Sequence, residues 1–232
     1  MKKVLAITLA RSGSKRIKKK NIKELNGKPL IYYTIKSALE SKKINRYIVS
    51  TDCKEIANIS KSLGAEIPFI RPKKYAKDST SDAISLRHAL HEMYTKYNYV
   101  PDIVINLRPT SPLRNGKIID AAVNKFIKYK PDLLRTVSKV EGASHPYWMY
   151  ILNKRGYARQ FVKKININKY YQSQSLPDIY KINGLVDVYS RNTVLKNKIL
   201  NGRMITLITK DDESLDIDTL RDFKLAEQLL KQ

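Results

Sequence analysis

Apolar and polar positions alternate along this chain in a way that predicts strands and helices in turn. Short apolar runs predict strands near 4–9, 46–52, 65–70, 102–107, 132–140, 185–189 and 204–208. Apolar residues at helical spacing predict helices near 28–41, 56–63, 81–98, 118–126 and 219–230. This alternation predicts an α/β fold in three layers, built on a mostly parallel, doubly wound sheet of the Rossmann-like kind.

Individual residues sharpen the predicted helices. Pro29 is expected in the first turn of the first helix, where its missing N–H is tolerated, and Gly64 is expected to end the second helix. In the helix at 81–98, one stripe of residues is expected to face the core: Ile84, Leu86, Leu90, Met93 and Tyr97.

Regular periodicity is lost between about 141 and 182, a segment that holds Trp148 and many Tyr and Asn. Such a segment is either an irregular lid or a protruding element at a subunit contact. The rest of the chain shows no internal repeat, linker or low-complexity tail. The sequence therefore predicts a single domain over 1–232 that carries this insertion.

The composition limits the possible cellular location of the protein and the kinds of disulfide or metal site that it can contain. No stretch approaches the roughly 18 uncharged apolar residues of a membrane span. Arg11 ends the short apolar run that follows Met1, Lys2 and Lys3, so no secretory signal is expected. A single cysteine, Cys53, excludes an internal disulfide and a multi-cysteine metal site. We therefore expect a cytoplasmic protein without a membrane partner.

The net charge of +24 suggests a polyanionic partner, but the charge is spread widely. Most of the excess is Lys, accompanied by Asn, Ile and Tyr, and all four have A/T-rich codons, so codon bias accounts for much of it. A nucleic-acid-binding protein would gather its cations on one face and space its aromatic residues for stacking. We expect no nucleic-acid partner, and the local clusters of cations fit an anionic substrate.

The most informative local feature is the basic loop, residues 10–21, which follows directly on the apolar run 4–9. Open α/β sheets bind ligands at the carboxyl ends of their strands. Gly13 permits close approach of a ligand to the backbone. Four cations of the loop can place charge on a triphosphate: Arg11, Lys15, Arg16 and Lys20. The loop lacks the glycine spacing of the known phosphate-binding fingerprints, so a solvated basic turn stays the alternative.

Two carboxylates stand close together near the C-terminus. If the chain is extended there, Asp216 and Asp218 project from the same face. Mg²⁺ takes oxygen ligands and binds through one or two carboxylates together with phosphate oxygens. The alternative is that Asp218 caps the helix that starts near Thr219 while Asp216 lies in solvent.

The loop 108–114, Arg-Pro-Thr-Ser-Pro-Leu-Arg, follows the strand predicted at 102–107. Its two prolines would hold the neighbouring hydroxyl and guanidinium groups in place, although a merely rigid turn has the same features. The remaining candidates are weaker. We expect His88 and His91 at the surface or in packing, His145 in a structural role, and Cys53 as a small buried residue.

Taken in order, these elements resemble the acylneuraminate cytidylyltransferase family, whose members activate sialic acids and related nonulosonic acids as CMP-sugars. The resemblance covers essentially the whole chain. Besides the basic loop and the loop 108–114, it rests on five segments, at 25–30, 48–52, 71–72, 183–184 and 216–219. Each match is weak alone, but their number and order make a strong signal.

The resemblance implies a role for each matching residue. CTP would be held by Ala10, Arg11, Gly13, Ser14, Lys15, Lys20, Asn21 and Arg71, the last of which would help to read cytosine. The acceptor sugar would face Arg108, Pro109, Thr110, Ser111, Lys181 and Asn183. Mg²⁺, or alternatively Mn²⁺, would bind Asp216 and Asp218, and these two would carry catalysis together with Arg11, Lys15 and Lys20. The irregular segment would reach a second subunit in a homodimer.

Two departures from the family pattern concern the sugar. Members usually have Gln where this chain has Arg108, so a neutral amide is replaced by a cation. Members often have Arg before and after a Leu-Pro pair, where this chain has Ser173 and Lys181. Those arginines typically bind the carboxylate of the acid or a phosphate, and Arg108 is a candidate for the replacement charge.

The implied reaction joins CTP to a nonulosonic acid, such as N-acetylneuraminate or legionaminate, and releases pyrophosphate. The CMP-sugar would serve the synthesis of a surface glycan such as lipopolysaccharide or capsule. The anomeric hydroxyl would attack the α-phosphorus in line, and catalysis would come from positioning and from neutralisation of charge. Related alternatives are a 3-deoxy-manno-octulosonate cytidylyltransferase and a sugar 1-phosphate guanylyltransferase. A basic nucleic-acid-binding protein is the distant alternative.

Overall fold

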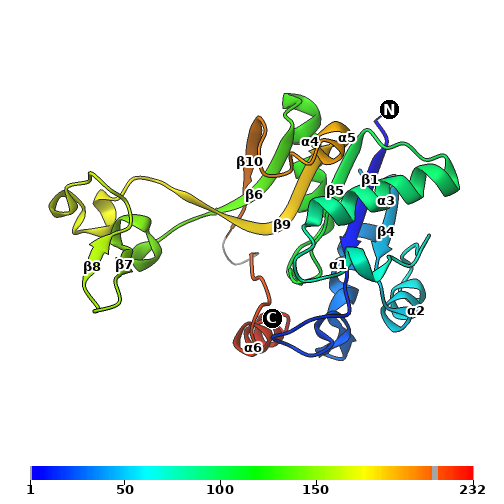
Figure 1. Cartoon of the computed structure of the whole chain (residues 1–232), viewed down its shortest axis with the longest axis horizontal. Coiled ribbons are helices and arrows are strands. Elements are labelled where there is room, and N and C mark those ends of the chain that lie inside the picture. The colour runs from blue at the N-terminus through cyan, green and yellow to red at the C-terminus, as the bar shows by residue number, and fades with distance from the viewer. Residues whose placement is uncertain (1, 211–213, 232) are drawn as a thin grey trace.

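The computed structural model describes residues 2–210 and 214–231, so the two ends of the predicted domain, residues 1 and 232, lie outside the described part. A central sheet of six strands runs through the protein (Figure 1). Its strands, in spatial order, are β10 (Met204–Ile208), β6 (Leu133–Lys139), β9 (Tyr180–Ser190), β5 (Ile103–Asn106), β1 (Val4–Leu9) and β4 (Arg46–Ser50).

The direction of the strands explains where a ligand can bind. β1 pairs in parallel with β4 and β5, and β10 pairs in parallel with β6. β9 lies antiparallel between β5 and β6. The chain leaves β1 for β4 on one side and later returns to β5 on the other side. A doubly wound sheet opens a crevice at such a switch point, beyond the carboxyl ends of its strands.

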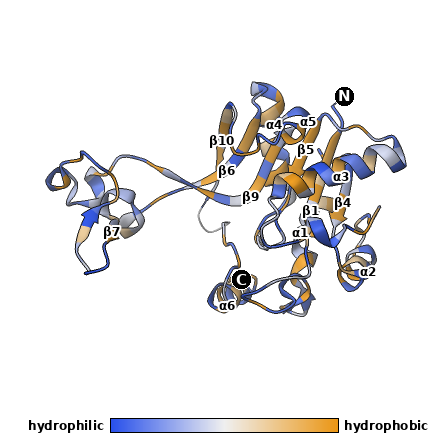
Figure 2. Ribbon diagram, viewed as in Figure 1, coloured by the Kyte–Doolittle hydropathy of each residue, from blue (hydrophilic) through white to orange (hydrophobic). Residues whose placement is uncertain are grey.

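Helices cover both faces of the sheet, as expected from the sequence. One face is covered by α1 (Leu30–Leu39), α2 (Lys54–Ser62) and α4 (Gly116–Tyr129), and the other by α3 (Asp82–Tyr97) and α5 (Arg191–Leu195). Figure 2 shows the apolar strands enclosed between these two layers. The mostly parallel, three-layer α/β fold is therefore confirmed, with β9 as its antiparallel member.

Alternation along β1 shows how one strand serves both layers. Val4 and Ala6 belong to the apolar cluster beneath α1 and α4, whereas Leu5 and Ile7 belong to the cluster beneath α3. Successive side chains of a strand point to opposite faces, so a strand covered on both sides is apolar throughout. This is the reason why the run 4–9 reads as continuously apolar.

A third apolar cluster lies below the sheet, where α6 (Leu220–Leu229) meets the start of the chain (Figure 1). Ile17 of the basic loop and Ile217 are buried there against Phe223. A small hairpin of β2 (Glu24–Leu25) and β3 (Lys28–Pro29) completes the cluster. The cluster holds the C-terminal segment beside the basic loop, although the two are about two hundred positions apart in the sequence.

Three sequence predictions need correction. The run 65–70 is not a strand, because it makes only isolated bridges, from Glu66 to Ile48 and from Ile70 to Thr51. Pro68 lies between these bridges, and a proline has no N–H to give to a ladder. Pro29 is not in the first turn of α1 but immediately before it.

The third correction concerns α3, whose stripe is rotated from the one expected. Ile84 and Tyr97 are 39% and 46% exposed, and the small residues Ala83 and Ala89 are buried instead. Alanines allow the helix to approach the sheet closely, so the buried stripe follows the small residues rather than every large one. The end of α2 at Gly64 is confirmed, because this residue has φ of +94°.

The segment at 141–182 projects from the body as an arm (Figure 1). It contains short 3-10 turns and one hairpin, β7 (Tyr150–Leu152) with β8 (Ala158–Gln160). The indole N–H of Trp148 donates to the carbonyl of Tyr170 at 2.7 Å, and Nε2 of His145 lies 3.2 Å from the carbonyl of Pro177. The irregular structure and the structural role of His145 are confirmed; the lid or dimer contact stays a prediction.

Among the described residues, no helix combines the length and the apolar character that a membrane crossing requires.

Candidate functional site

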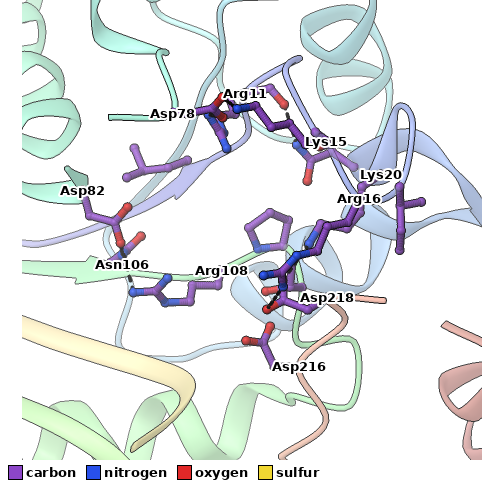
Figure 3. Close-up of a pocket in the computed structure, with 16 residues that line it drawn as sticks. Arg11, Lys15, Arg16, Lys20, Asp78, Asp82, Asn106, Arg108, Asp216 and Asp218 are labelled. Carbon is purple, nitrogen blue, oxygen red and sulfur yellow. Dashed lines mark hydrogen bonds and ion pairs between the residues drawn. The ribbon is translucent and has the colours of Figure 1, made fainter. Parts of the chain in front are cut away.

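A pocket of about 570 Å³ opens at the carboxyl edge of the sheet (Figure 3). It is lined by the basic loop after β1, by the residues that end and follow β5, and by the segment before α6. These are the segments that the sequence singled out, and the fold brings them to the switch point between β1 and β5. The three elements named from the sequence therefore form one site.

Two buried residues and several hydrogen bonds hold the basic loop in place. Ala10 and Asn21 are buried, and the amide of Asn21 donates to the carbonyl of Arg11 at 2.9 Å. The backbone and hydroxyl of Ser12 donate to the two carboxylate oxygens of Asp52 at 2.9 and 2.7 Å. Asp52 follows β4, so the neighbouring strand anchors the loop. These contacts order the backbone of the loop; its role as a phosphate site stays a prediction, with the solvated basic turn as the alternative.

Four cations of this loop line the pocket, and each forms an ion pair there. Arg11 and Lys15 contact Asp78, the latter at 2.6 Å. Arg16 and Lys20 contact Asp218, at 3.2 and 3.3 Å. Ser14 lines the pocket beside them, whereas Ala10 and Gly13 do not reach it. The loop thus presents two pairs of cations, each held by one carboxylate.

The two aspartates near the C-terminus both reach the pocket (Figure 3). Ile217 between them is buried, and its N–H donates to the carbonyl of Thr110 at 2.8 Å. Because side chains alternate along an extended segment, burial of Ile217 turns Asp216 and Asp218 the other way. The cap of α6 is Thr219, with Asp222 completing a capping box, so the alternative role of Asp218 as a helix cap is wrong.

These carboxylates fit a magnesium ion that is bound together with phosphate. The described residues contain no cluster of three or more His, Cys, Asp or Glu side chains of the kind that holds a metal without help. Mg²⁺ commonly uses one or two carboxylates and takes its remaining oxygens from phosphate and water. Asp216 and Asp218 in a pocket lined with cations match that donor set.

The other side of the pocket is built around Arg108, which follows β5. Its guanidinium contacts Asp82 at 3.0 Å and the buried Asp187 at 3.7 Å. Burial alone would lower the pKa of Arg108, but the two carboxylates raise it. Burial raises the pKa of Asp187, while Arg108 and Arg135 oppose that effect. The charge of Arg108 is thus balanced by the protein itself.

Gly184 on β9 lies beside the side chain of Arg108. A Cβ at Gly184 would lie 3.4 Å from the Cδ of Arg108, and the residue has φ of +72°, a conformation that favours glycine. Asp82 is also held by the amide of Asn106 at 3.2 Å. Asp82 and Asn106 both line the pocket, and the sequence analysis named neither of them.

Arg114 explains the rigidity of the loop 108–114. It is buried and donates to four acceptors: Ser37 Oγ, the carbonyl of Leu185, Thr34 Oγ1 and the carbonyl of Arg108. Burial lowers its pKa to about 10, so the guanidinium is still charged near neutral pH. The prolines were the visible signal in the sequence, but this buried cation joins the loop to α1 and β9.

The other residues expected to face the sugar have different surroundings. Pro109 and Thr110 line the pocket. Ser111 is buried with its hydroxyl 3.5 Å from the carbonyl of Gly184, and it is outside the pocket lining. The amide of Asn183 donates to Ser138 of β6 and to Thr209, which follows β10. Lys181 lies on an exposed part of β9, outside the pocket lining.

Arg71 lines a second, smaller cavity of about 230 Å³. Its side chain is buried, its Nε has no hydrogen-bond partner, and burial lowers its pKa while Asp52 and Asp82 oppose that effect. The two cavities share Leu9, Arg11, Asp78 and Asp82 in their walls. The two cavities are therefore adjacent. The Nε of Arg71 is a buried donor in the smaller cavity, and buried donors in proteins are usually hydrogen-bonded.

Comparison with known proteins identifies the family of the chain. The model of a family described as cytidylyltransferase matches residues 5–232. CMP-N,N'-diacetyllegionaminic acid synthase of Legionella pneumophila is 33% identical over 99% of this chain and 97% of its own. Post-translational flagellin modification protein B of Campylobacter coli is 32% identical over 100% of this chain and 97% of its own. A solved structure of CMP:2-keto-3-deoxy-manno-octonic acid synthetase complexed with CTP has a TM-score of 0.72 at 17% identity, with 99% of each chain covered.

Proposed function

Since this chain belongs to the cytidylyltransferase family and is a nucleotidyltransferase, we propose that it transfers CMP from CTP to a nonulosonic acid. The observation that carries the proposal is the convergence in one pocket of the basic loop, the Asp216/Asp218 pair and the loop after β5. Cations that can bind a polyphosphate line the same pocket as carboxylates that can bind its metal ion. The anomeric hydroxyl of the sugar would attack the α-phosphorus, with pyrophosphate as the leaving group.

The residues divide the work as follows. Arg11, Lys15 and Lys20 bind the triphosphate and neutralise the charge that develops on it. Arg71 in the adjacent cavity offers its unpartnered Nε to the base. Thr110 and Arg108 lie on the acceptor side and orient the sugar. Asn183 and Ser111 do not line the pocket. Their hydrogen bonds would support the acceptor side by holding β9 and the loop 108–114 in position.

Asp216 and Asp218 would hold Mg²⁺, with Mn²⁺ as the alternative, and the ion would supply charge for the phosphate oxygens. For Asp218 this requires that it leaves its ion pairs with Arg16 and Lys20. Those cations then become available to the phosphates. The same rearrangement therefore frees a carboxylate for the metal ion and two cations for the phosphates.

The acceptor is proposed to be a legionaminate-like or sialic acid-like nonulosonic acid. Support comes from the named product of the Legionella pneumophila relative, which is similar along nearly its whole length. The Campylobacter coli relative is named for flagellin modification, which supports a role in making a surface glycan. 3-Deoxy-manno-octulosonate is the alternative acceptor, named by a structure that shares the fold at 17% identity.

A cytoplasmic homodimer completes the proposal. The arm exposes large apolar residues that a second copy of the chain would cover, among them Leu152, Tyr157 and Tyr171 at 65%, 73% and 75% exposure. Large exposed apolar patches on a protein mark interaction sites, and a second copy of the arm could bury these side chains. Nucleic acid and membrane are not among the proposed partners.

One assay tests the function: pyrophosphate release with each of four nucleoside triphosphates, against a panel of nonulosonic acids, 3-deoxy-manno-octulosonate and sugar 1-phosphates. We expect release with CTP and a nonulosonic acid in the presence of Mg²⁺. Asp218→Ala should lose most activity and keep the fold, because the side chain of Asp218 is 54% exposed. Glu66→Ala, which removes an ion pair with Arg46 away from the pocket, is the matched control.

Activity with GTP alone would reject the proposed nucleotide. Activity with a sugar 1-phosphate would reject the proposed acceptor. Full turnover by a folded Asp218→Ala variant would reject the metal assignment.

A further inference from the structure

We propose that Asp78 is an internal competitor of the nucleotide: its carboxylate occupies the cations Arg11 and Lys15 and must be displaced when a triphosphate binds. The identity of the nucleotide as CTP rests on the proposed function. Competition for the two cations does not, because any polyphosphate that reaches them would meet the same carboxylate.

The contacts place Asp78 where phosphate oxygens are expected. One of its oxygens pairs with the guanidinium of Arg11, and the other lies 2.6 Å from Nζ of Lys15. All three side chains line the pocket and are labelled in the upper part of Figure 3. A carboxylate that bridges two cations uses the same donors as a phosphate group would.

Asp78 also stands at the boundary between the two cavities. Arg11 and Asp78 line both the larger cavity and the smaller one that holds Arg71. A nucleotide whose base meets Arg71 and whose phosphates meet Lys15 and Lys20 must pass this ion pair. Displacement of Asp78 therefore releases the two cations and moves a side chain of the wall that the two cavities share.

The segment that carries Asp78 permits such a movement. It lies in a turn between the short 3-10 helix Lys73–Tyr75 and α3, closed by a hydrogen bond from Thr80 N–H to the carbonyl of Lys77 at 3.0 Å. The side chain of Asp78 is 43% exposed, so its release into solvent leaves no buried charge behind. Hydrogen bonds from Lys15 and Arg11 hold the pKa of Asp78 below its usual range, so it is ionised at neutral pH.

The chain offers a matched control on the same loop. Lys19 of the basic loop forms an ion pair with Glu55 at 2.8 Å, and neither residue lines the pocket. Removing the charge of Glu55 changes the net charge as much as removing that of Asp78, and it also releases a cation of the basic loop. It frees no cation inside the pocket.

The test is calorimetric titration of the full chain with tripolyphosphate and with CTP, in EDTA, at low and at high salt. Asp78→Asn should lower the Kd for tripolyphosphate by about threefold to tenfold, as expected from the loss of two exposed ion pairs that compete with the ligand. Asp78→Glu should restore the wild-type Kd, and Glu55→Gln should leave it unchanged. The difference should shrink at high salt because exposed charges are screened.

Equal or weaker binding of tripolyphosphate by Asp78→Asn would overturn the proposal, since a carboxylate that helps to hold the nucleotide gives that result. A gain of the same size in Glu55→Gln would also overturn it, because it would reflect net charge alone. Asp78→Ser supplies a second neutral side chain if Asp78→Asn folds poorly. If tripolyphosphate behaves as expected while CTP gives no CMP-sugar, the competition stands and the proposed function fails.

Discussion

The capping box of α6 supports the segment that carries the paired aspartates, and its removal has a calculable effect. Thr219 Oγ1 accepts the N–H of Asp222, and the carboxylate of Asp222 accepts the N–H and hydroxyl of Thr219. The same carboxylate accepts the N–H of Asp218 at 3.1 Å. The box therefore joins the start of the helix to the proposed metal ligand.

The expected losses follow from the number of hydrogen bonds removed. Loss of an N-cap costs about 1 kcal/mol, so Thr219→Ala should lower the free energy of unfolding by about that amount. Asp222→Ala removes charged hydrogen bonds at a partly exposed site and should cost about 1 to 1.5 kcal/mol. The double variant should lose about 1.5 kcal/mol rather than the sum, because each side chain depends on the other.

Urea unfolding followed by circular dichroism would measure these losses, with turnover measured in parallel. Of these two side chains, it is that of Asp222 that accepts the N–H of Asp218. Turnover should therefore fall further in Asp222→Ala than in Thr219→Ala. Ser190→Ala is the matched control, since Ser190 caps α5 through the N–H of Thr193. It should lower stability by a similar amount and leave turnover unchanged.

Strictly additive losses, within about 0.3 kcal/mol, would refute the reciprocal capping. Equal turnover in the two single variants would refute the proposed support of Asp218.

Two further predictions concern the scaffold. Gly116→Ala should destabilise the protein by about 1 to 3 kcal/mol, because a Cβ there would lie 2.9 Å from the backbone of Glu40. Thermal melts of the two variants would measure this. Gly13→Ala should leave the melting temperature unchanged, because a Cβ there has no atom within 4 Å. Equal melting temperatures of Gly116→Ala and wild type would contradict the clash. The hydrogen bond from the N–H of Lys3 lowers the pKa of Asp102, so its charge stabilises the fold above the ordinary pKa of 3.8 and stops doing so as pH falls through the lowered value. Asp102→Asn should therefore be less stable than wild type in urea at pH 7 and equal to it in strong acid, and a constant difference between the two pH values would contradict the assignment.

The sequence was sufficient for the parts of the fold that depend on local pattern. Strand β1 and helix α4 are apolar where they are buried, and periodicity found both. The run 65–70 misled because its composition suits a strand, while Pro68 interrupts the ladder. The sequence also did not predict the rotation of α3. Small residues such as Ala83 carry little weight in a hydropathy pattern, although they decide how closely the helix can approach the sheet.

For the site, the sequence found the residues that stand in motifs and missed those that act through distant partners. Asp78 lies in a turn of no special composition, and its role depends on Arg11, which is 67 positions away. Asp187 reads as a polar interruption of an apolar strand, which is a signal for a buried partner of a cation. That partner is Arg108, which the sequence shows as a cation where the family usually has Gln. The sequence did not show that Asp82 and Asp187 balance its charge.

The antiparallel direction of β9 has a consequence for the length of the arm. β6 leaves the sheet and β9 re-enters beside it from the same edge, so the arm is the closed end of a long two-stranded connection. The entropy of closing such a loop grows only with the logarithm of its length, and halving the arm would change it by about 0.6 kcal/mol. The six-stranded register therefore places almost no limit on how long this connection is. As far as the sheet is concerned, the length of the arm can change while the pairing of β6 with β9 stays the same.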